Sequence, residues 1–342
     1  MPDTLLARYA ESLFWLARYI ERAENLARIL DVNETFARDR AGARDWLPIL
    51  QLNADQERFF SGHKVASAES VLRFYVTDAE NPTSIASAVR FARENARTLR
   101  PLISTEMWVQ LNRFHNRMAM LDESELAPGN RTHVFAEIKE ACQTHTGITD
   151  GTFYRDQGWY FYHIGRYIER ADQTTRLLDI KYHLLLPRAS DVGSPVDISQ
   201  WNALLRSVSG YHAYLRMQSG QITPARVAGF LVFNRRFPRS VFLCIRNVET
   251  LLTELKSRYS LRGGVSAAER IDETRAALSS ITIKSVIRQG LHEFLDAIQR
   301  QLIAITADLS ADFFASTPTI PESPAGQAQI QSLGEMTQRQ VG

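Results

Sequence analysis

The feature that most constrains the fold of this chain is a polar helical motif that occurs twice. Residues 18–31 read RYIERAENLARILD and residues 166–179 read RYIERADQTTRLLD. The offset is a constant 148 residues, and nine of the 14 positions are identical. The sequences around the two copies have mostly diverged. Such a repeat predicts two related helical units that pack against each other.

On a helical wheel at about 100° per residue, the first copy has an apolar face and a polar face. The apolar face consists of Leu13, Leu16, Tyr19, Ile20, Ala23, Ala27 and Leu30. The polar face consists of Arg18, Glu21, Arg22, Asn25 and Arg28. Glu24 and Asp31 flank Arg28 by one turn on either side, and Asp172, Arg176 and Asp179 repeat that spacing. Any packed helix retains its apolar positions, whereas a merely solvated polar face should drift.

The retained polar faces have two interpretations. They could meet inside the bundle and pair with each other, because buried ion pairs add little net stability but can fix geometry. They could instead line a shared cleft for a charged ligand. The arginines that would then engage carboxylate or phosphate groups are Arg18, Arg22, Arg28, Arg166, Arg170 and Arg176. Glu21 and Glu169 would orient them or meet a substrate amine.

Helical periodicity runs through almost the whole chain, and strand signals are nearly absent. Helices are expected at residues 4–37, 54–61, 66–77, 83–103, 104–121, 131–147, 152–186, 197–217, 223–233, 238–260, 266–280 and 283–314. This pattern predicts an all-α multi-helix bundle with an internal pseudo-duplication. Residues 1–315 are expected to form one helical domain with pseudo-repeats at about 1–150 and 151–315. Residues 316–342, which are rich in Pro, Ser, Gly and Gln, are expected to be a disordered tail.

A stripe of arginines occupies the helix expected at residues 83–103. Arg90, Arg93, Arg97 and Arg100 recur at i, i+3, i+7 and i+10, with only Glu94 as an acid beside them. The stripe could clamp a phosphate or carboxylate, or it could neutralise the acids of the repeat helices. A third basic cluster surrounds Phe237-Pro238, where a helix is expected to begin and backbone donors favour anions. It consists of Arg235, Arg236 and Arg239.

Composition excludes several classes of protein. The net charge of +2 over 342 residues argues against a nucleic-acid footprint. Five of the 40 basic residues are lysines, so 35 are arginines. Cys142 and Cys244 lie far apart, which excludes a disulfide scaffold and fits a reducing compartment. No secretory h-region and no 18-residue apolar span occurs, so a soluble, cytoplasmic protein without membrane association is expected.

Fingerprints of catalysis are missing. The chain has no GxGxxG, GxxxxGK[ST], HExxH or GxSxG motif. His133, Glu137 and Glu140 share a helical face, but neither repeat has the His three residues after its Glu that di-iron bundles use. We therefore expect no metal and no cofactor. Glu21 and Glu169 are the candidates for a general acid/base pair across a cleft, although binding is favoured over catalysis.

Several segments resemble the bacterial alpha-E family. They are LLARYAESLFWLARYIERAENLARILD (residues 5–31), FARENAR (91–97), STEMWVQLN (104–112), YIERADQTTRLLD (167–179) and FPRSV (237–241). The resemblance extends from the start of the chain to about residue 315. It implies an all-helical domain of poorly defined biochemistry. Such domains are typically encoded beside, or fused to, a circularly permuted ATP-grasp ligase and a transglutaminase-like protein. The family has no settled catalytic residues that could be transferred to this chain.

The sequence favours a non-catalytic binding or adaptor subunit, and the resemblance implies that it belongs to an ATP-dependent peptide-ligation or peptide-modification system. Its arginine-rich helix faces would recognise a peptide, an amino acid or a ligase partner. The resemblance implies an ATP-grasp ligase and a transglutaminase-like protein as partners, and a homo-oligomer is left open. Two alternatives are an enzyme that uses Glu21 and Glu169 as acid and base, and a purely structural helical protein.

Overall fold

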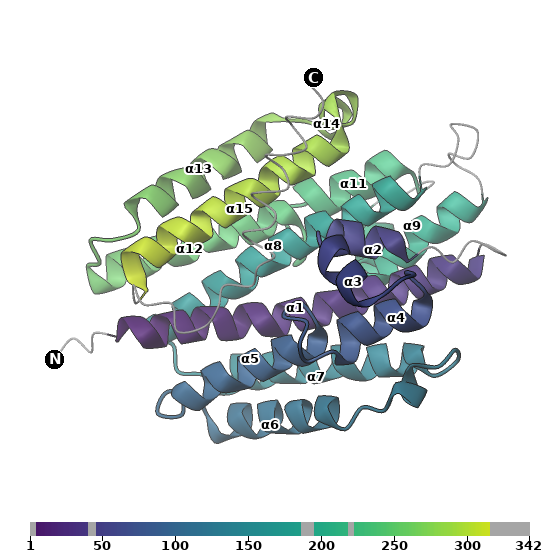
Figure 1. The fold of residues 1–342 in the computed structure, drawn as a ribbon. Coiled ribbons are helices and arrows are strands. Elements are labelled where there is room, and N and C mark those ends of the chain that lie inside the picture. The colour runs from purple at the N-terminus through teal and green to yellow at the C-terminus, as the bar shows by residue number, and fades with distance from the viewer. Residues whose placement is uncertain (1–4, 40–45, 186–194, 218–221, 315–342) are drawn as a thin grey trace.

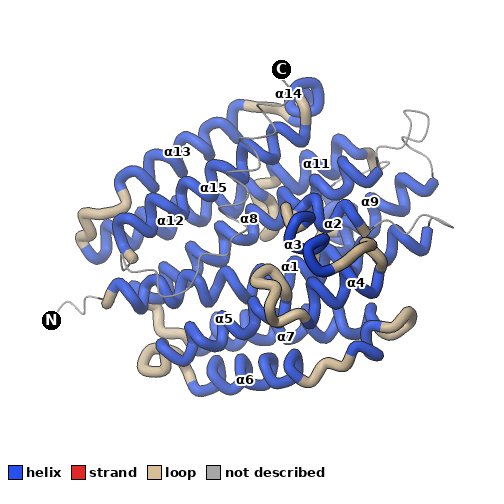
Figure 2. The backbone as a smooth tube through the Cα atoms, in the orientation of Figure 1, coloured by secondary structure: helices blue, strands red, loops and turns tan. Residues whose placement is uncertain are grey.

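The structure, a computed structural model, describes residues 5–39, 46–185, 195–217 and 222–314. These residues form helices joined by loops and contain no β-strand (Figure 2). The prediction of an all-α protein is therefore confirmed. The tail expected at residues 316–342 lies outside the described residues. No helix in the described ranges is long and apolar enough to cross a membrane.

The elements follow one another along the chain as labelled in Figure 1. The helices of the first half are α1 (Ala7–Asp39), α2 (Leu47–Leu52), α3 (Gln56–Gly62), α4 (Ala68–Leu72), the π-helical η1 (Arg73–Thr77), α5 (Ile85–Thr98), α6 (Thr105–Ala119), the 3₁₀ turn η2 (Glu123–Leu126) and α7 (Arg131–Thr152). The second half contains α8 (Gln157–Leu185), α9 (Pro195–Ser207), α10 (Tyr211–Met217), α11 (Pro224–Phe233), α12 (Val241–Tyr259), α13 (Val265–Ser280), α14 (Ile283–Gln289) and α15 (Leu291–Phe313).

The two motif-bearing helices, α1 and α8, pack against each other at the centre of the molecule (Figure 1). Helices α5 and α7 pack on α1, and α6 covers both. Helices α12 and α15 pack on α8, and α13 covers both. The prediction that the two copies of the motif share one core is confirmed.

The middle of α1 is enclosed on its polar side as well as its apolar side. Leu13 is fully buried, and Glu21 and Arg28 are only 2% and 4% exposed. Helix α8 approaches so closely that a Cβ atom on Gly165 would lie 2.4 Å from the carbonyl oxygen of Phe14. The polar face of the motif therefore lies between helices, where each charged group needs a partner.

Several helix ends differ by a few residues from the sequence expectations: α5 ends at Thr98 rather than 103, and α7 continues to Thr152 rather than 147. The division into α-helices differs in three places. The helix expected at 197–217 divides into α9 and α10 because Ser209 has a left-handed backbone (φ 56°) and the Gly210 N–H donates to the Leu205 carbonyl. The helix expected at 283–314 divides at Gly290, where φ is 113°. Helix α2 was not expected. Continuous apolar periodicity concealed the first two breaks, and α2 is too short to show a period.

Candidate functional site

The carboxylate of Glu169 on α8 is the centre of one charged cluster, here called the Glu169 cluster. Arg22 donates to it through Nε at 2.7 Å and Nη2 at 3.0 Å. Arg18, one turn earlier on α1, donates through Nε at 2.8 Å. Gln173 adds an amide donor at 3.1 Å. Glu169 is fully buried, and both carboxylate oxygens are occupied by charged donors.

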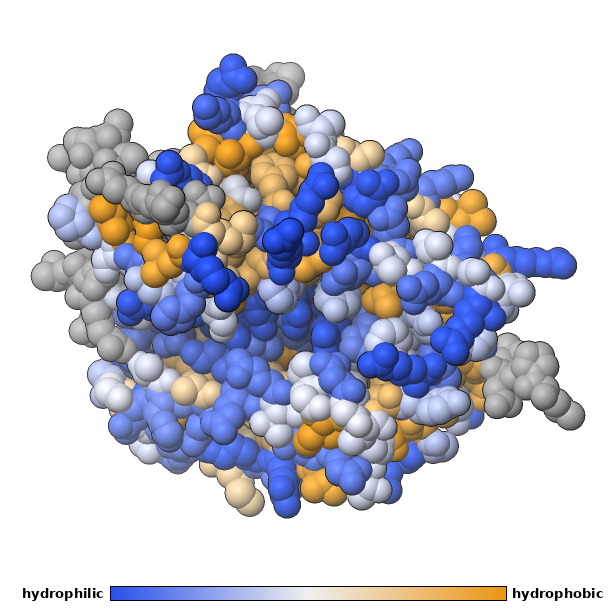
Figure 3. All heavy atoms as spheres, turned by 180° about the vertical axis from the view of Figure 1, so that it is seen from behind, coloured by the Kyte–Doolittle hydropathy of each residue, from blue (hydrophilic) through white to orange (hydrophobic). Residues whose placement is uncertain are grey.

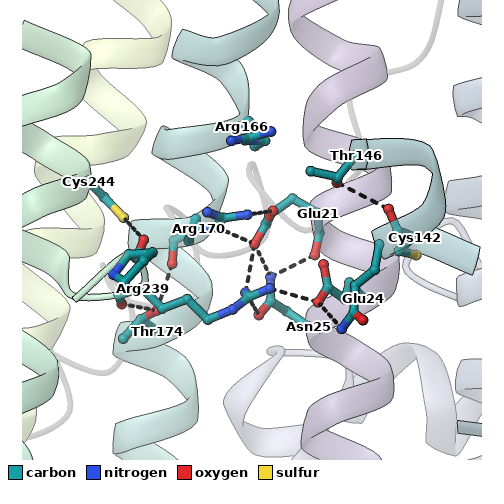
Figure 4. A network of polar contacts seen from close by, with 12 residues as sticks. Glu21, Glu24, Asn25, Cys142, Thr146, Arg166, Arg170, Thr174, Arg239 and Cys244 are labelled. Carbon is teal, nitrogen blue, oxygen red and sulfur yellow. Dashed lines mark hydrogen bonds and ion pairs between the residues drawn. The ribbon is translucent and has the colours of Figure 1, made fainter. Parts of the chain in front are cut away.

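The Glu21 carboxylate on α1 is the centre of a second cluster, here called the Glu21 cluster (Figure 4). Arg170 donates through Nε at 2.8 Å and Nη2 at 2.7 Å, and Asn25 donates its amide at 3.0 Å. Each of these contacts repeats one in the Glu169 cluster at a position 148 residues away. The two Glu-Arg dipeptides thus exchange partners reciprocally, as the cross-pairing interpretation expects.

The third arginine of each copy holds the end of a short helix. Arg28 donates to the carbonyl of Ser207, the last residue of α9. Arg176 donates to the carbonyl of Leu52, the last residue of α2, at 2.9 Å. Carbonyls at a helix C-terminus lack intrahelical donors, and a cation there is favourable. Each copy of the motif therefore supports the helix that follows the other copy.

The charge ladders expected within each copy form in part. The ion pairs one turn apart are Glu24–Arg28 and Asp172–Arg176. Asp31 does not continue the ladder, because it pairs with Lys139 of α7 at 2.7 Å. Asp179 contacts His292 of α15 at 3.0 Å. Helices α7 and α15 thus each supply a partner to the last acid of one copy.

Electrostatics keeps both glutamates ionised. Burial raises the pKa of Glu169, but the guanidinium groups of Arg22 and Arg18 outweigh it and lower the pKa to about 2. Burial likewise opposes ionisation of Glu21, and Arg170 holds its pKa well below the usual range. A general acid or base needs a pKa near the working pH and access to a proton. These carboxylates are suited to holding helices together rather than to proton transfer.

The two clusters differ at one position. By the repeat, Arg166 should bind Glu21 as Arg18 binds Glu169, but its Nη1 contacts Asp150 of α7 at 3.3 Å and its Nε has no partner. Arg239 takes this place, with Nη1 at 2.9 Å from Glu21.

The sequence places Arg239 only in the third basic cluster, beside Arg235 and Arg236. In the structure it reaches the Glu21 cluster from the residue before the N-cap of α12, and its Nη2 lies 2.7 Å from Glu24. The two other arginines of that cluster, Arg235 and Arg236, are less buried than Arg239, which is 9% exposed. In the sequence, Arg239 could be singled out only as part of the FPRSV segment (residues 237–241), and that segment does not indicate which residue Arg239 contacts.

Arg90, Arg93 and Arg97 of the stripe lie on α5 and Arg100 lies just after its end, and within the described residues none of them pairs with an acid of the repeat helices. Arg93 donates to Asn112 of α6 at 2.8 Å and, like Arg97, pairs with Glu94. Arg100 lies over the ring of Trp108 at 4.8 Å. Arg90 donates to the carbonyl of Ala79 at 3.3 Å. The alternative that the stripe neutralises the repeat acids is therefore wrong.

In the part of the chain that the structure describes, no group of three or more His, Cys, Asp or Glu side chains is placed to hold a metal ion. His133 contacts Glu137 at 3.3 Å, and Glu137 also pairs with Arg117.

Hydrophilic residues form a band across the middle of the face opposite that of Figure 1, with more apolar regions above it (Figure 3).

Comparison with known proteins identifies relatives but no activity. The chain is 23% identical over 291 residues to an uncharacterised protein of Mycobacterium bovis and to two uncharacterised proteins of Mycobacterium tuberculosis. Each match covers 79% of this chain and 32% of the relative, so the chain spans about a third of the length of these proteins. No solved structure matches the chain. Residues 5–314 match the alpha-E family, described as a predicted alpha-helical domain with a conserved ER motif, and the chain belongs to this family.

Proposed function

We propose that the chain is a non-catalytic adaptor subunit of a cytoplasmic, ATP-dependent peptide-ligation or peptide-modification system. In this role the Glu21 and Glu169 clusters form a rigid frame, and the arginine stripe of α5 faces an acidic partner. The observation that carries the proposal is the contrast between these two sets of charges. The glutamates best suited to catalysis are buried and saturated with arginine donors, whereas Arg97 of the stripe is 70% exposed.

We further propose that the frame arose by duplication of one helical unit, with halves at about residues 1–150 and 151–315. The packing of α5, α6 and α7 around α1 resembles that of α12, α13 and α15 around α8. The reciprocal exchange between the two Glu-Arg dipeptides also supports this. In this proposal the family's ER motif corresponds to residues 21–22 and 169–170.

The length of the relatives supports a role in which this chain acts together with another protein or domain. The match covers 32% of each mycobacterial protein, so the related helical segment there belongs to a longer chain. In our proposal an ATP-grasp ligase is the partner that binds this chain, and a transglutaminase-like protein belongs to the same system. An acidic surface on the ligase would suit the fork of donors that arginine offers.

The test is calorimetric titration of the ATP-grasp ligase encoded nearest to this chain into the full-length protein, at low and high salt. The double variant Arg93→Gln and Arg97→Gln should weaken binding by about tenfold or more and flatten its salt response. Added salt shortens the screening length, which is about 8 Å at physiological ionic strength, and so weakens exposed charge pairs that the variant lacks. The control changes Arg216 and Arg246, two exposed arginines elsewhere, to Gln. Equal affinities and salt responses for both double variants and the wild type would overturn the proposal.

A further inference from the structure

A pocket with a volume of about 510 Å³ opens between α1, α7 and α9, at the end of the first copy of the motif. Its polar lining includes Asp31, Thr35, Lys139, Asn202, Arg206 and Ser207. None of these side chains belongs to the Glu21 or Glu169 cluster. The pocket adjoins the frame, however, because the carbonyl of Ser207 accepts a hydrogen bond from Arg28.

Two polar atoms of this lining are buried without a hydrogen-bond partner. Ser207 is 8% exposed, and its Oγ has no partner. The Oδ1 atom of Asn202 is buried and lacks a donor. Buried polar atoms are nearly always satisfied in native proteins, and each exception calls for an explanation. Both residues line the pocket, so a rotation of the Asn202 side chain would bring Oδ1 to an N–H donor of a ligand there, and a rotation of Ser207 would bring its hydroxyl to the same ligand.

The charges around the pocket are of both signs. Asp31 and Lys139 form an ion pair of 2.7 Å, and their side chains are 21% and 20% exposed. Arg206 is exposed, and its guanidinium lies 4.8 Å from the centre of the Tyr211 ring. Arg206 forms no ion pair within the described residues. The pocket therefore offers the carboxylate of Asp31 and two cations, Lys139 and Arg206. Of these two, Lys139 is in an ion pair, whereas the guanidinium of Arg206 lies over an aromatic ring.

We infer that this pocket binds a small zwitterion, namely a free α-amino acid or a short peptide. Its carboxylate would be held by the guanidinium of Arg206, which can form paired hydrogen bonds. Its ammonium group would donate to Asp31 and to Oδ1 of Asn202. This inference rests on the proposed binding function and gives its amino-acid or peptide ligand a site and a chemistry, distinct from the partner surface on α5.

The experiment is isothermal titration calorimetry on the full-length protein. The probes are the common protein amino acids, first as a mixture and then singly, and a matched set of dipeptides. For each probe that binds, its N-acetyl derivative and its carboxamide are also titrated. The pocket variants are Arg206→Gln and Ser207→Ala, and the control is Arg246→Gln on the exposed face of α12. Both pocket variants should fold, because Arg206 is exposed and the Ser207 Oγ has no partner to lose.

Saturable binding of an amino acid or a dipeptide is expected, and the probe that binds identifies the source. Blocking either charged end should weaken it by about tenfold or more, as should Arg206→Gln, because hydrogen bonds to charged groups are among the stronger ones. Ser207→Ala should weaken binding less, and Arg246→Gln should leave it unchanged. Binding of no zwitterion to the wild type, or equal binding by Arg206→Gln, would overturn the inference. The ligase titration of the α5 variants reports on the proposed function separately.

Discussion

At the residue scale, each central glutamate is held by a fork of two parallel hydrogen bonds from one arginine, Arg22 for Glu169 and Arg170 for Glu21. A carboxylate buried at this depth loses its hydration, and only nearby cations and donors can compensate. Arginine suits this task because its guanidinium stays charged and matches the two carboxylate oxygens. The retention of the Glu-Arg dipeptide in both copies follows from this mutual dependence.

The depressed pKa of Glu169 predicts a specific loss of stability in acid. Its pKa is about 2 in the folded protein and about 4.3 in an unfolded chain. The stabilisation is therefore complete above about pH 4.3 and is lost as the pH falls towards 2, in total of the order of 3 kcal/mol. Urea unfolding at a series of pH values should show Glu169→Gln less stable than wild type at pH 7, with the gap closing towards pH 2.

A matched control for this titration is Glu94→Gln. Glu94 also pairs with two arginines, but its side chain is 37% exposed. Its removal should change the free energy of unfolding by less than about 1 kcal/mol, because exposed ion pairs contribute little. A gap for Glu169→Gln that stays constant from pH 7 to pH 2 would show that the Glu169 carboxylate is not selectively stabilised by folding.

At the scale of elements, α1 and α8 can form these pairs only because their backbones approach closely. Gly165 lies where α8 meets Phe14, and the position equivalent to it in α1 is the buried Ala17. Small residues at a helix crossing bring the axes together, so that side chains one turn later can reach across. The two helices therefore share a small residue just before the motif as well as the charges within it.

Gly165→Ala should destabilise the protein by about 2 kcal/mol or more, because the new Cβ would lie 2.4 Å from a backbone oxygen that cannot move independently of α1. Gly147→Ala is the control, since it also lies inside a helix but a Cβ atom added there would have no atom within 4 Å. It should stabilise the protein by about 0.5–1 kcal/mol through helix propensity. Thermal and urea unfolding measure both effects, and equal stability of the two variants would refute the close-packing argument.

At the scale of the whole molecule, the sequence was sufficient to predict an all-α protein in which the two motif helices share one core. The repeat predicted the paired helices, and its retained charges suggested their cross-pairing. The contact of Arg239 with Glu21 could not be predicted, because it joins residues 218 positions apart and Arg239 lies outside the repeat. The ion pair between Lys139 and Asp31 could not be predicted for the same reason, and neither could the buried, unpaired polar atoms of Asn202 and Ser207. Tertiary packing alone brings these groups together.

The most direct test of whether the repeated Glu-Arg pairs form a frame is the free energy of unfolding of Arg170→Ala, measured in urea beside Arg97→Ala. Removing Arg170 leaves the buried Glu21 carboxylate short of two donors, and a loss of about 3 kcal/mol is expected. The exposed Arg97 should matter by less than about 1 kcal/mol. If Arg170→Ala instead unfolds like the wild type while partner or ligand binding is lost, the motif is a binding site and not a frame.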